Sequence, residues 1–249
     1  MEDLDQLVRR VDEDRWLASR FAPENVRARL IALYAVNYEI ARTPETVSEA
    51  GLGDIRLEWW RSALEEIAEG YVARSHPALA AFFATARNID LARTLMSITK
   101  ARAVDLEAAP FDTWEKLETY VARTARALMW AATESCEASL STAEQHRFLD
   151  CAAQAWGYCG LLRSEPHWRA RGRSFLPEGA SRDEVFARAG AAYAEAKALS
   201  RTLPAAAFPA LGYVTLVPGY LRVLAHGKNG TALFVRQAAL VGASATGQI

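Results

Sequence analysis

The sequence is poor in the residues that build metal centres and disulfide frameworks. Its 249 residues include three cysteines and four histidines. Cys136, Cys151 and Cys159 are odd in number and lack the spacing of metal ligands, so we expect reduced residues in the core of a protein from a reducing compartment. The histidines are scattered along the chain, which argues against a zinc site.

Several functional signatures are also missing. There is no G-x-S-x-G, no H-E-x-x-H and no P-loop. The net charge of -1 provides no broad basic field for a nucleic-acid partner. The charged N-terminal stretch has no apolar signal core, and we expect no run to approach the ~20 apolar residues of a membrane span. These absences predict a cytoplasmic protein, with peripheral contact at the inner membrane as the most that it would make.

What the sequence has is one helical pattern after another. Alanine is abundant, strand-like alternation is almost absent, and 51% of the residues are hydrophobic. The apolar spacing predicts helices over 3–20, 23–43, 53–70, 76–87, 89–107, 113–136, 142–163, 182–202, 207–226 and 230–241. Because no flexible linker or internal repeat interrupts them, we expect one all-α domain over residues 1–249, with its helices around a shared interior.

Three of these helices have a capping-box spacing at their predicted start. The pairs are Asp112–Glu115, Ser141–Glu144 and Ser181–Glu184.

Polar residues fall within otherwise apolar helices at two places in the first half of the chain. Asn37, Tyr38 and Arg42 lie near one another at helical spacing, so they could face an interior cavity or form a solvated helix end. Arg56 lies four residues before Trp60 and follows the same spacing. Since Trp59 and Trp60 are adjacent, one of them should fill the core while the other packs at an edge, which is a structural role.

Two further clusters lie later in the chain. Asp105 and Tyr120 interrupt apolar stretches, and a satisfied core hydrogen bond explains them as well as a binding role does. The stretch LLRSEPHWRARGRSFLP, residues 161–177, carries four arginines. Clustered guanidinium groups suit phosphate or carboxylate recognition, and a solvated loop is the alternative.

Three short motifs point to a family. They are Trp60-Arg61-x-x-Leu64, His76-Pro77 and the run GRSFLP at 172–177. On these motifs the sequence resembles the squalene/phytoene synthase family over nearly its whole length. The resemblance implies an all-α helical bundle of the isoprenoid synthase type with a central cavity.

The resemblance breaks down at the acidic residues. Family enzymes bind prenyl diphosphate through Mg²⁺ held by two aspartate-rich motifs, and here the second motif's aspartates fall on Ser164 and Trp168. In the first motif, Arg42 stands where an acid is expected and only Glu45 keeps a carboxylate. A positive charge ~5 Å from Mg²⁺ costs roughly 6 kcal/mol at an effective dielectric near 20. We therefore expect no catalytic residues and no metal ligands.

The pattern of loss resembles one branch of the family, which includes the mitochondrial assembly factor for respiratory complex I and its alphaproteobacterial relatives. It implies a non-catalytic factor in complex I assembly, with respiratory-chain partners, or in lipid binding. The alternative is an active enzyme that condenses two prenyl diphosphates head-to-head, with Mg²⁺ as its cofactor. That alternative needs new metal ligands, for which the candidates are Glu39, Glu45, Asp105 and Glu165.

A third hypothesis keeps binding without catalysis. Arg42, Arg163 and Arg173 would replace the metal ions and hold a prenyl diphosphate or another lipid phosphate directly. The candidate cavity residues are Asn37, Tyr38, Arg42, Glu45, Arg56, Asp105, Tyr120, Arg163, Ser164, Trp168 and Arg173. The apolar run 204–227 either contacts a membrane or a partner, or is buried as core.

Overall fold

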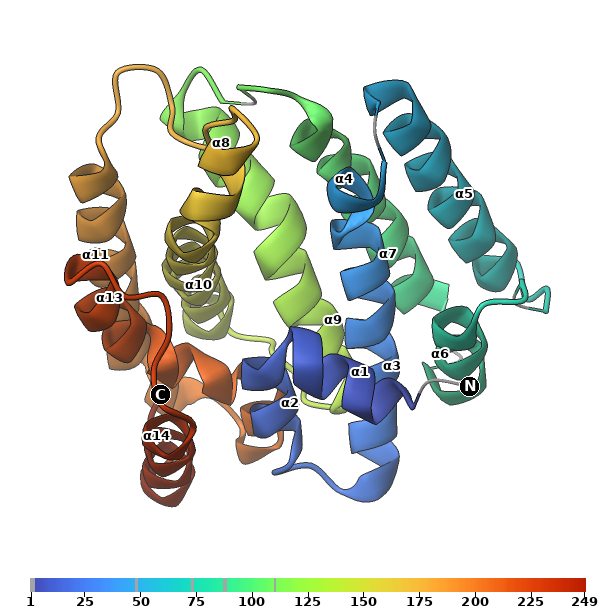
Figure 1. Cartoon of the computed structure of the whole chain (residues 1–249). Helices are drawn as coiled ribbons and strands as arrows, with labels where there is room; N and C mark the ends of the chain where they lie inside the picture. The colour runs from blue at the N-terminus through green and yellow to red at the C-terminus, as the bar shows by residue number, and fades with distance from the viewer. Residues whose placement is uncertain (1–2, 48, 73, 87–88, 110) are drawn as a thin grey trace.

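The computed structural model describes residues 3–47, 49–72, 74–86, 89–109 and 111–249. Every regular element in these ranges is a helix, which confirms the all-α prediction (Figure 1). The first half contains α1 (Leu4–Val11), α2 (Glu13–Ser19), α3 (Glu24–Ala41), α4 (Thr43–Thr46), α5 (Ala50–Ala68), α6 (Pro77–Ala86), α7 (Ile89–Ala101) and η1 (Arg102–Leu106). The second half contains α8 (Trp114–Val121), η2 (Ala122–Arg126), α9 (Ala127–Ser135), α10 (Ala143–Ala170), α11 (Arg182–Leu199), η3 (Ser200–Thr202), η4 (Ala205–Ala207), α12 (Phe208–Leu211), η5 (Gly212–Leu216), α13 (Val217–Ala225) and α14 (Leu233–Thr246).

Three long helical segments stand side by side at the centre of the molecule. They are α3, the continuous run from α8 through η2 to α9, and α10 (Figure 1). The helices α5 and α7 cover one flank, α11 and α13 cover the other, and α1 and α2 cross the lower front. The largest fully buried side chains, Trp60, Tyr34, Tyr158, Tyr213 and Tyr220, come from both flanks and from the centre, so the packed interior is shared.

Two helix boundaries differ from those predicted from the sequence. The predicted helix 3–20 is split at Asp12, whose φ of −145° leaves the helical region. The helix predicted to end at 163 continues to Ala170 and runs through Pro166. Most of the arginine-rich stretch is therefore the last part of α10 and not a loop.

The capping boxes show the same kind of shift. Ser181 and Glu184 form the predicted box, but Thr113, not Asp112, caps α8. At α10 the box is Thr142 with Gln145, one residue beyond the predicted pair. Glutamine serves there because its amide oxygen accepts from backbone N–H groups while its Nε2 donates to the carbonyl of Thr202 at 2.8 Å, which a glutamate cannot do.

The apolar C-terminal run is folded into the core. Residues 205–225 are long and apolar enough to cross a membrane, with a mean hydropathy of 1.2, so the expectation that no run approaches a span was wrong. In the fold, however, 61% of the most apolar window is buried, and Tyr213 and Tyr220 are enclosed. Burial as core is thus the alternative that the structure bears out for this run.

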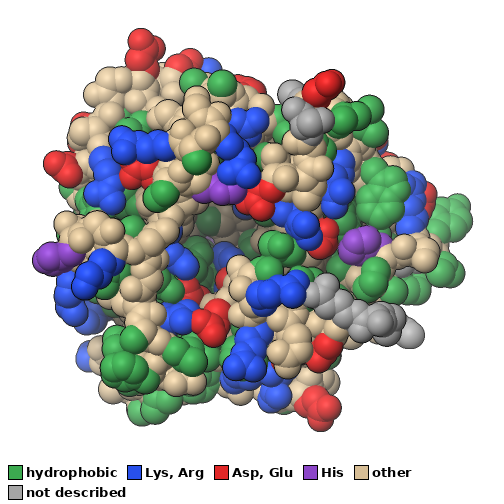
Figure 2. Space-filling model, in the orientation of Figure 1, with side chains coloured by type: hydrophobic (Ala, Val, Ile, Leu, Met, Phe, Trp, Pro, Cys, Tyr) green, Lys and Arg blue, Asp and Glu red, His purple; other side chains and the backbone are tan. Residues whose placement is uncertain are grey.

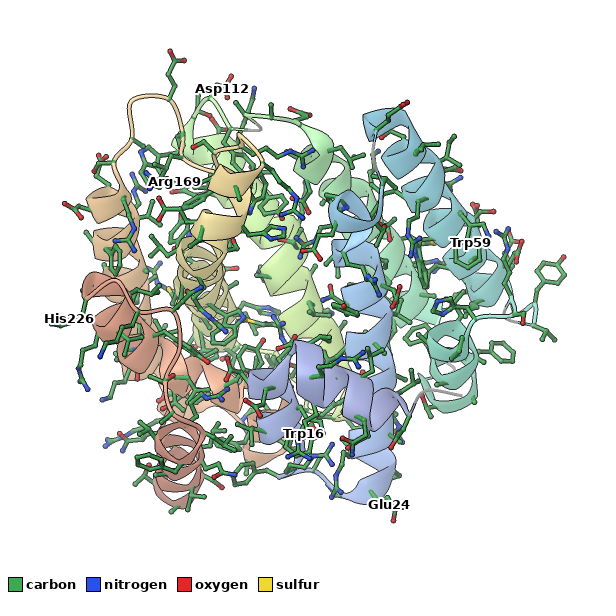
Figure 3. All side chains as sticks on the ribbon, viewed as in Figure 1. Trp16, Glu24, Trp59, Asp112, Arg169 and His226 are labelled. Carbon is green, nitrogen blue, oxygen red and sulfur yellow. The ribbon has the colours of Figure 1, made fainter. Side chains whose placement is uncertain are left out.

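The paired tryptophans and the cysteines lie as expected. Trp60 is 1% exposed, whereas Trp59 is 37% exposed and lies on the outer side of α5 (Figure 3). The three cysteines are free and buried. Burial raises the pKa of Cys136 and of Cys159 to about 12, so both thiols stay protonated and behave as small apolar side chains.

Two glycines of α10 provide a matched test of the central packing. A Cβ at Gly157 would lie 2.8 Å from Cγ1 of Val121, a stiff β-branched side chain, whereas a Cβ at Gly160 would meet nothing within 4 Å. We predict that Gly157→Ala lowers the free energy of unfolding by about 1–3 kcal/mol through overpacking. Gly160→Ala should be neutral or stabilising by up to about 1 kcal/mol.

Thermal unfolding measures both variants, since 1 kcal/mol shifts Tm by about 2–4 °C in a chain of this size. Val121→Ala in the Gly157→Ala background should recover part of the loss. Equal melting temperatures for the two glycine variants would contradict this account of the crossing between α8 and α10.

Candidate functional site

The arginine-rich stretch ends α10 in a defined turn. Gly172 has a φ of +66°, which favours glycine, and its N–H donates to the carbonyl of Arg169 at 3.0 Å. The N–H of Arg173 donates to the carbonyl of Trp168 at 2.9 Å. These two bonds form a Schellman motif, which reverses the chain at the helix end. The glycine of the GRSFLP run thereby turns Arg173 back toward η1.

A cavity of about 290 Å³ lies beneath this turn, between the three central segments. Figure 2 shows a hollow near the middle of this face, with blue, red and purple side chains around its rim. Four arginines, two carboxylates and one histidine line it, so arginine charge exceeds carboxylate charge by two. The lining is Arg15, Asn37, Ala41, Pro44, Glu45, Arg102, Asp105, Tyr120, Val121, Thr124, Ala125, Leu128, Trp156, Gly157, Gly160, Leu161, Ser164, His167, Trp168, Arg171 and Arg173.

A closed polar cluster lies on the η1 side of the cavity. Arg102 Nη1 donates to Oδ2 of Asp105 at 3.0 Å and to the hydroxyl of Tyr120 at 2.6 Å. The Tyr120 hydroxyl donates in turn to Oδ1 of Asp105 at 2.7 Å. Both Asp105 oxygens are therefore already bonded, and Asp105 is only 5% exposed. Arg173 completes the cluster by donating from Nη1 to the Asp105 carbonyl at 2.8 Å.

The charge states of this cluster follow from its burial. Burial of Tyr120 raises the pKa of its hydroxyl, which stays protonated and remains the donor to Asp105. Burial opposes the charge of Arg102, but Tyr120 and Asp105 outweigh that effect and raise its pKa. The cluster is thus a buried ion pair with a neutral phenol between its members, and a satisfied hydrogen bond accounts for Asp105 and Tyr120.

The rim of the cavity is closed by a contact between α4 and α10. His167 Nε2 lies 3.3 Å from Oε1 of Glu45, and Arg171 Nη1 lies 2.8 Å from Nδ1 of the same histidine. Because a guanidinium only donates, Nδ1 accepts from Arg171, and Nε2 carries the proton that faces Glu45. Half-buried Trp168 lines the cavity beside this contact. The Ser164 hydroxyl donates to the carbonyl of Leu161 within its own helix.

Four of the sequence-predicted candidates lie outside this lining. Arg42 pairs with Glu39 at 3.3 Å, and Arg56 approaches the same carboxylate at 3.5 Å. Tyr38 packs its ring against the Arg42 guanidinium, 5.3 Å from the ring centroid. Arg163 is directed to Asp14 of α2 and Tyr220 of α13.

Arg163 belongs to a second charged cluster, which holds the C-terminal helices. It lies 3.3 Å from Oδ2 of Asp14 and 4.0 Å from the ring centroid of Tyr220. Asp14 also accepts from Tyr220 at 2.7 Å and from Arg236 at 2.7 Å. The expectation that Arg42, Arg163 and Arg173 converge on one phosphate is therefore wrong in its geometry, since only Arg173 lines the cavity.

The sequence reasoning missed the other cationic residues of the cavity. Arg15 is 8% exposed, and its guanidinium lies 4.9 Å from the ring centroid of Tyr213 and 5.7 Å from that of Tyr34. Nothing near Arg15 in the sequence distinguishes it from a surface arginine. Arg102 could have been found, because it stands three residues before Asp105, a spacing that pairs opposite charges on a helix.

The comparison with known proteins agrees with these motifs. A family model described as squalene/phytoene synthase matches residues 8–184, well over half of the chain. The chain belongs to the squalene/phytoene synthase family. Complex I assembly factor 6 from Bos taurus is 27% identical over 243 residues, covering 87% of this chain and 71% of that protein. The Homo sapiens protein is 26% identical with the same coverage.

Solved structures share the fold of this family member. A dehydrosqualene synthase in complex with a ligand has a TM-score of 0.80 at 14% identity, over 98% of this chain and 94% of that one. A squalene synthase from Alicyclobacillus acidocaldarius has a TM-score of 0.66 at 19% identity, over 98% and 92%. At these identities the likeness shows the isoprenoid-synthase fold.

This squalene/phytoene synthase family member has no acidic set suited to Mg²⁺ in the ranges that the structure describes. No group of three His, Cys, Asp or Glu side chains there could hold a metal ion. Each acid proposed for the altered enzyme already has a hydrogen-bond donor beside it: Glu39 has Arg42, Asp105 has Arg102, Glu45 has the His167 N–H, and Glu165 has Arg182 at 2.7 Å. Nor do two aspartates stand four residues apart anywhere in the sequence. The donor set does not fit the metal.

The cluster at Asp105 should contribute measurably to stability. We predict that Tyr120→Phe lowers the free energy of unfolding by about 1–3 kcal/mol, because it removes hydrogen bonds to two charged groups. Asp105→Ala should cost more, about 3–5 kcal/mol, since it leaves Arg102 without its ion-pair partner in a largely buried position.

Denaturant unfolding measures these changes. Tyr38→Phe is the matched control, because phenylalanine keeps the ring contact with Arg42 and the expected change is within about 0.5 kcal/mol. If Asp105→Ala were as stable as the parent protein, Asp105 would not be held as an ion pair and would be free to bind a ligand.

Proposed function

We propose that this chain is a non-catalytic member of the squalene/phytoene synthase family that acts in the assembly of respiratory complex I. The observation that carries the proposal is the similarity to mammalian proteins named complex I assembly factor 6, over 87% of the chain. The cavity supports the proposal, because Arg102 occupies the carboxylate of Asp105, the acid that lines the cavity from η1. Partners in this role are other assembly factors or subunits of the respiratory chain.

The cavity volume also favours this function over head-to-head condensation. Ligand pockets commonly span about 300–1,000 Å³, so a cavity of about 290 Å³ suits one small ligand rather than two prenyl chains. Ionisation of a prenyl diphosphate further requires stabilisation of the leaving group, which Mg²⁺ supplies in such reactions. With Asp105 held by Arg102 and Tyr120, and Glu45 facing the His167 N–H, the site has no acidic set to hold that metal.

Deletion of the gene in its own host tests the assembly role. We predict a strong decrease in assembled complex I on native gels and in NADH:ubiquinone activity, with the other respiratory complexes unchanged. Re-expression of the wild-type chain should restore both readouts. Normal complex I in the deletion strain, or an equal decrease of all respiratory complexes, would refute a specific role in complex I assembly.

A second candidate function is binding of one prenyl diphosphate or another lipid phosphate without metal. The observation that favours it is that Arg102 and Arg173, which both bond to Asp105, share the cavity lining with the apolar side chains of Val121, Ala125 and Leu128. Guanidinium groups bind phosphate oxygens directly by charge-assisted hydrogen bonds. Such a ligand would place its head group at the arginines and its tail against the apolar wall.

Calorimetry with farnesyl diphosphate tests this binding. We predict micromolar or weaker affinity that EDTA does not change. Arg173→Ala should weaken it about tenfold or more, since a hydrogen bond to a charged group is lost. Arg42→Ala is the matched control, because Arg42 lies outside the lining and pairs with Glu39. Binding that strictly needs Mg²⁺ would contradict this second candidate, and turnover with release of diphosphate would contradict both candidate functions.

A further inference from the structure

The charges of this chain are unevenly distributed along the sequence. No aspartate or glutamate follows Glu195, and the last 54 residues carry five basic side chains, at Lys197, Arg201, Arg222, Lys228 and Arg236. The whole chain has 29 basic and 30 acidic residues, so the first 195 residues hold 24 basic and all 30 acidic ones. The C-terminal part is thus +5 while the rest is -6. Such an asymmetry is typical of a surface that meets an anionic partner.

The same C-terminal part exposes apolar side chains on α14. Phe234 is 72% exposed, Val241 59%, Val235 44% and Leu233 39%. Phe234 and Val241 are seven residues apart, so they share one face of the helix, together with the small residues at 238 and 245. Figure 2 shows green side chains gathered at the lower left, where α14 lies in Figure 1, with blue side chains close by.

The only charged residue of α14 is used in contacts with the rest of the fold, which leaves its outer face uncharged. Leu240 and Ala243 are its buried residues, and it packs mainly on η5. Its only charged residue, Arg236, turns inward, where it donates to Oδ1 of Asp14 at 2.7 Å and forms an ion pair with Glu13. Asp14 also pairs with Arg163, so both acids at the start of α2 face cations, and the outward side chains of α14 are mostly apolar.

We propose that α14, the segment 226–232 before it and Arg222 near the end of α13 form a docking surface for an anionic lipid bilayer. The apolar side chains of α14 would enter the boundary between head groups and acyl chains, while Arg222 and Lys228, both exposed, approach the lipid phosphates. The proposal is independent of the function proposed above. It also differs from contact through residues 205–225, whose apolar side chains are largely buried in the core.

Charge decides between the occupants of such a face. Two copies of the chain meeting through this surface would bring Arg222 and Lys228 of one copy toward those of the other, and like charges at an interface disfavour that contact. An anionic bilayer offers both an apolar layer and the opposite charge.

A second exposed apolar group lies on α5 and includes Leu52, Ile55 and Trp59. This helix carries four acids against two arginines, so the same bilayer would repel it.

Vesicle co-sedimentation of the purified full chain tests the proposal. We predict binding to vesicles of phosphatidylcholine and phosphatidylglycerol in equal parts, much weaker binding to phosphatidylcholine alone, and a loss of affinity with added salt. Phe234→Ser with Val241→Ser should lower partitioning at least about tenfold. Arg222→Glu with Lys228→Glu should lower it at least about twentyfold on the anionic vesicles.

Ile55→Glu is the matched control, since Ile55 is 68% exposed on the acidic α5 face and its replacement should leave partitioning unchanged. All substituted side chains are largely exposed, and circular dichroism checks that each variant is folded. Absence of binding to the anionic vesicles at low salt would overturn the proposal. So would equal binding by the parent and the α14 variant, or a dimer in sedimentation velocity that the α14 substitutions dissociate.

Discussion

The bonding of Asp105 is the constraint on which the chemistry of the cavity depends. Arg102 and Tyr120 occupy both of its carboxylate oxygens, and Arg173 binds its backbone carbonyl. A carboxylate in that state can accept little more, and its charge is cancelled within 3.0 Å. Of the two acids that line the cavity, Asp105 is therefore unavailable as a ligand, and the arginines outnumber the acids. An enzyme that needs Mg²⁺ requires the reverse arrangement, with anionic oxygens directed inward.

The cavity and the C-terminal helices are held by the same device, a buried carboxylate with several donors. Asp105 ties η1 to α8 and to the turn after α10. Asp14 ties α2 to α10, α13 and α14 through Arg163, Tyr220 and Arg236. Buried pairs of this kind contribute little net stability but make the loss of one partner costly. The directional bonds of Asp105 and Asp14 fix how these helices are placed, whereas contacts between apolar side chains alone would allow several placements.

Much of the fold was predictable because apolar spacing and helix-start signals are local. The all-α class, the Ser181 capping box and the opposite environments of Trp59 and Trp60 all followed from neighbouring residues. The site was only partly predictable. Asp105, Tyr120, Ser164, Trp168 and Arg173 do line one cavity, yet Arg42 turns away to Glu39. Spacing places a residue on a helix but does not choose which partner a long arginine side chain reaches.

The missed residues show the same limit. Arg15 reaches the cavity because a break at Asp12 starts a new helix, and the sequence pattern had joined the two helices into one. The continuation of α10 through Pro166 likewise changed a presumed loop into a helix end that aims Arg173 inward. In both cases tertiary packing overrode the local signal.

The central claim is that arginines, not metal ions, provide the positive charge in this cavity. It is tested most directly by anomalous diffraction from crystals grown with Mn²⁺ and a non-hydrolysable analogue of farnesyl diphosphate. The account predicts no anomalous peak in the cavity, with Arg102 still bonded to Asp105. A peak coordinated by Asp105 or Glu45, with Arg102 displaced, would contradict it.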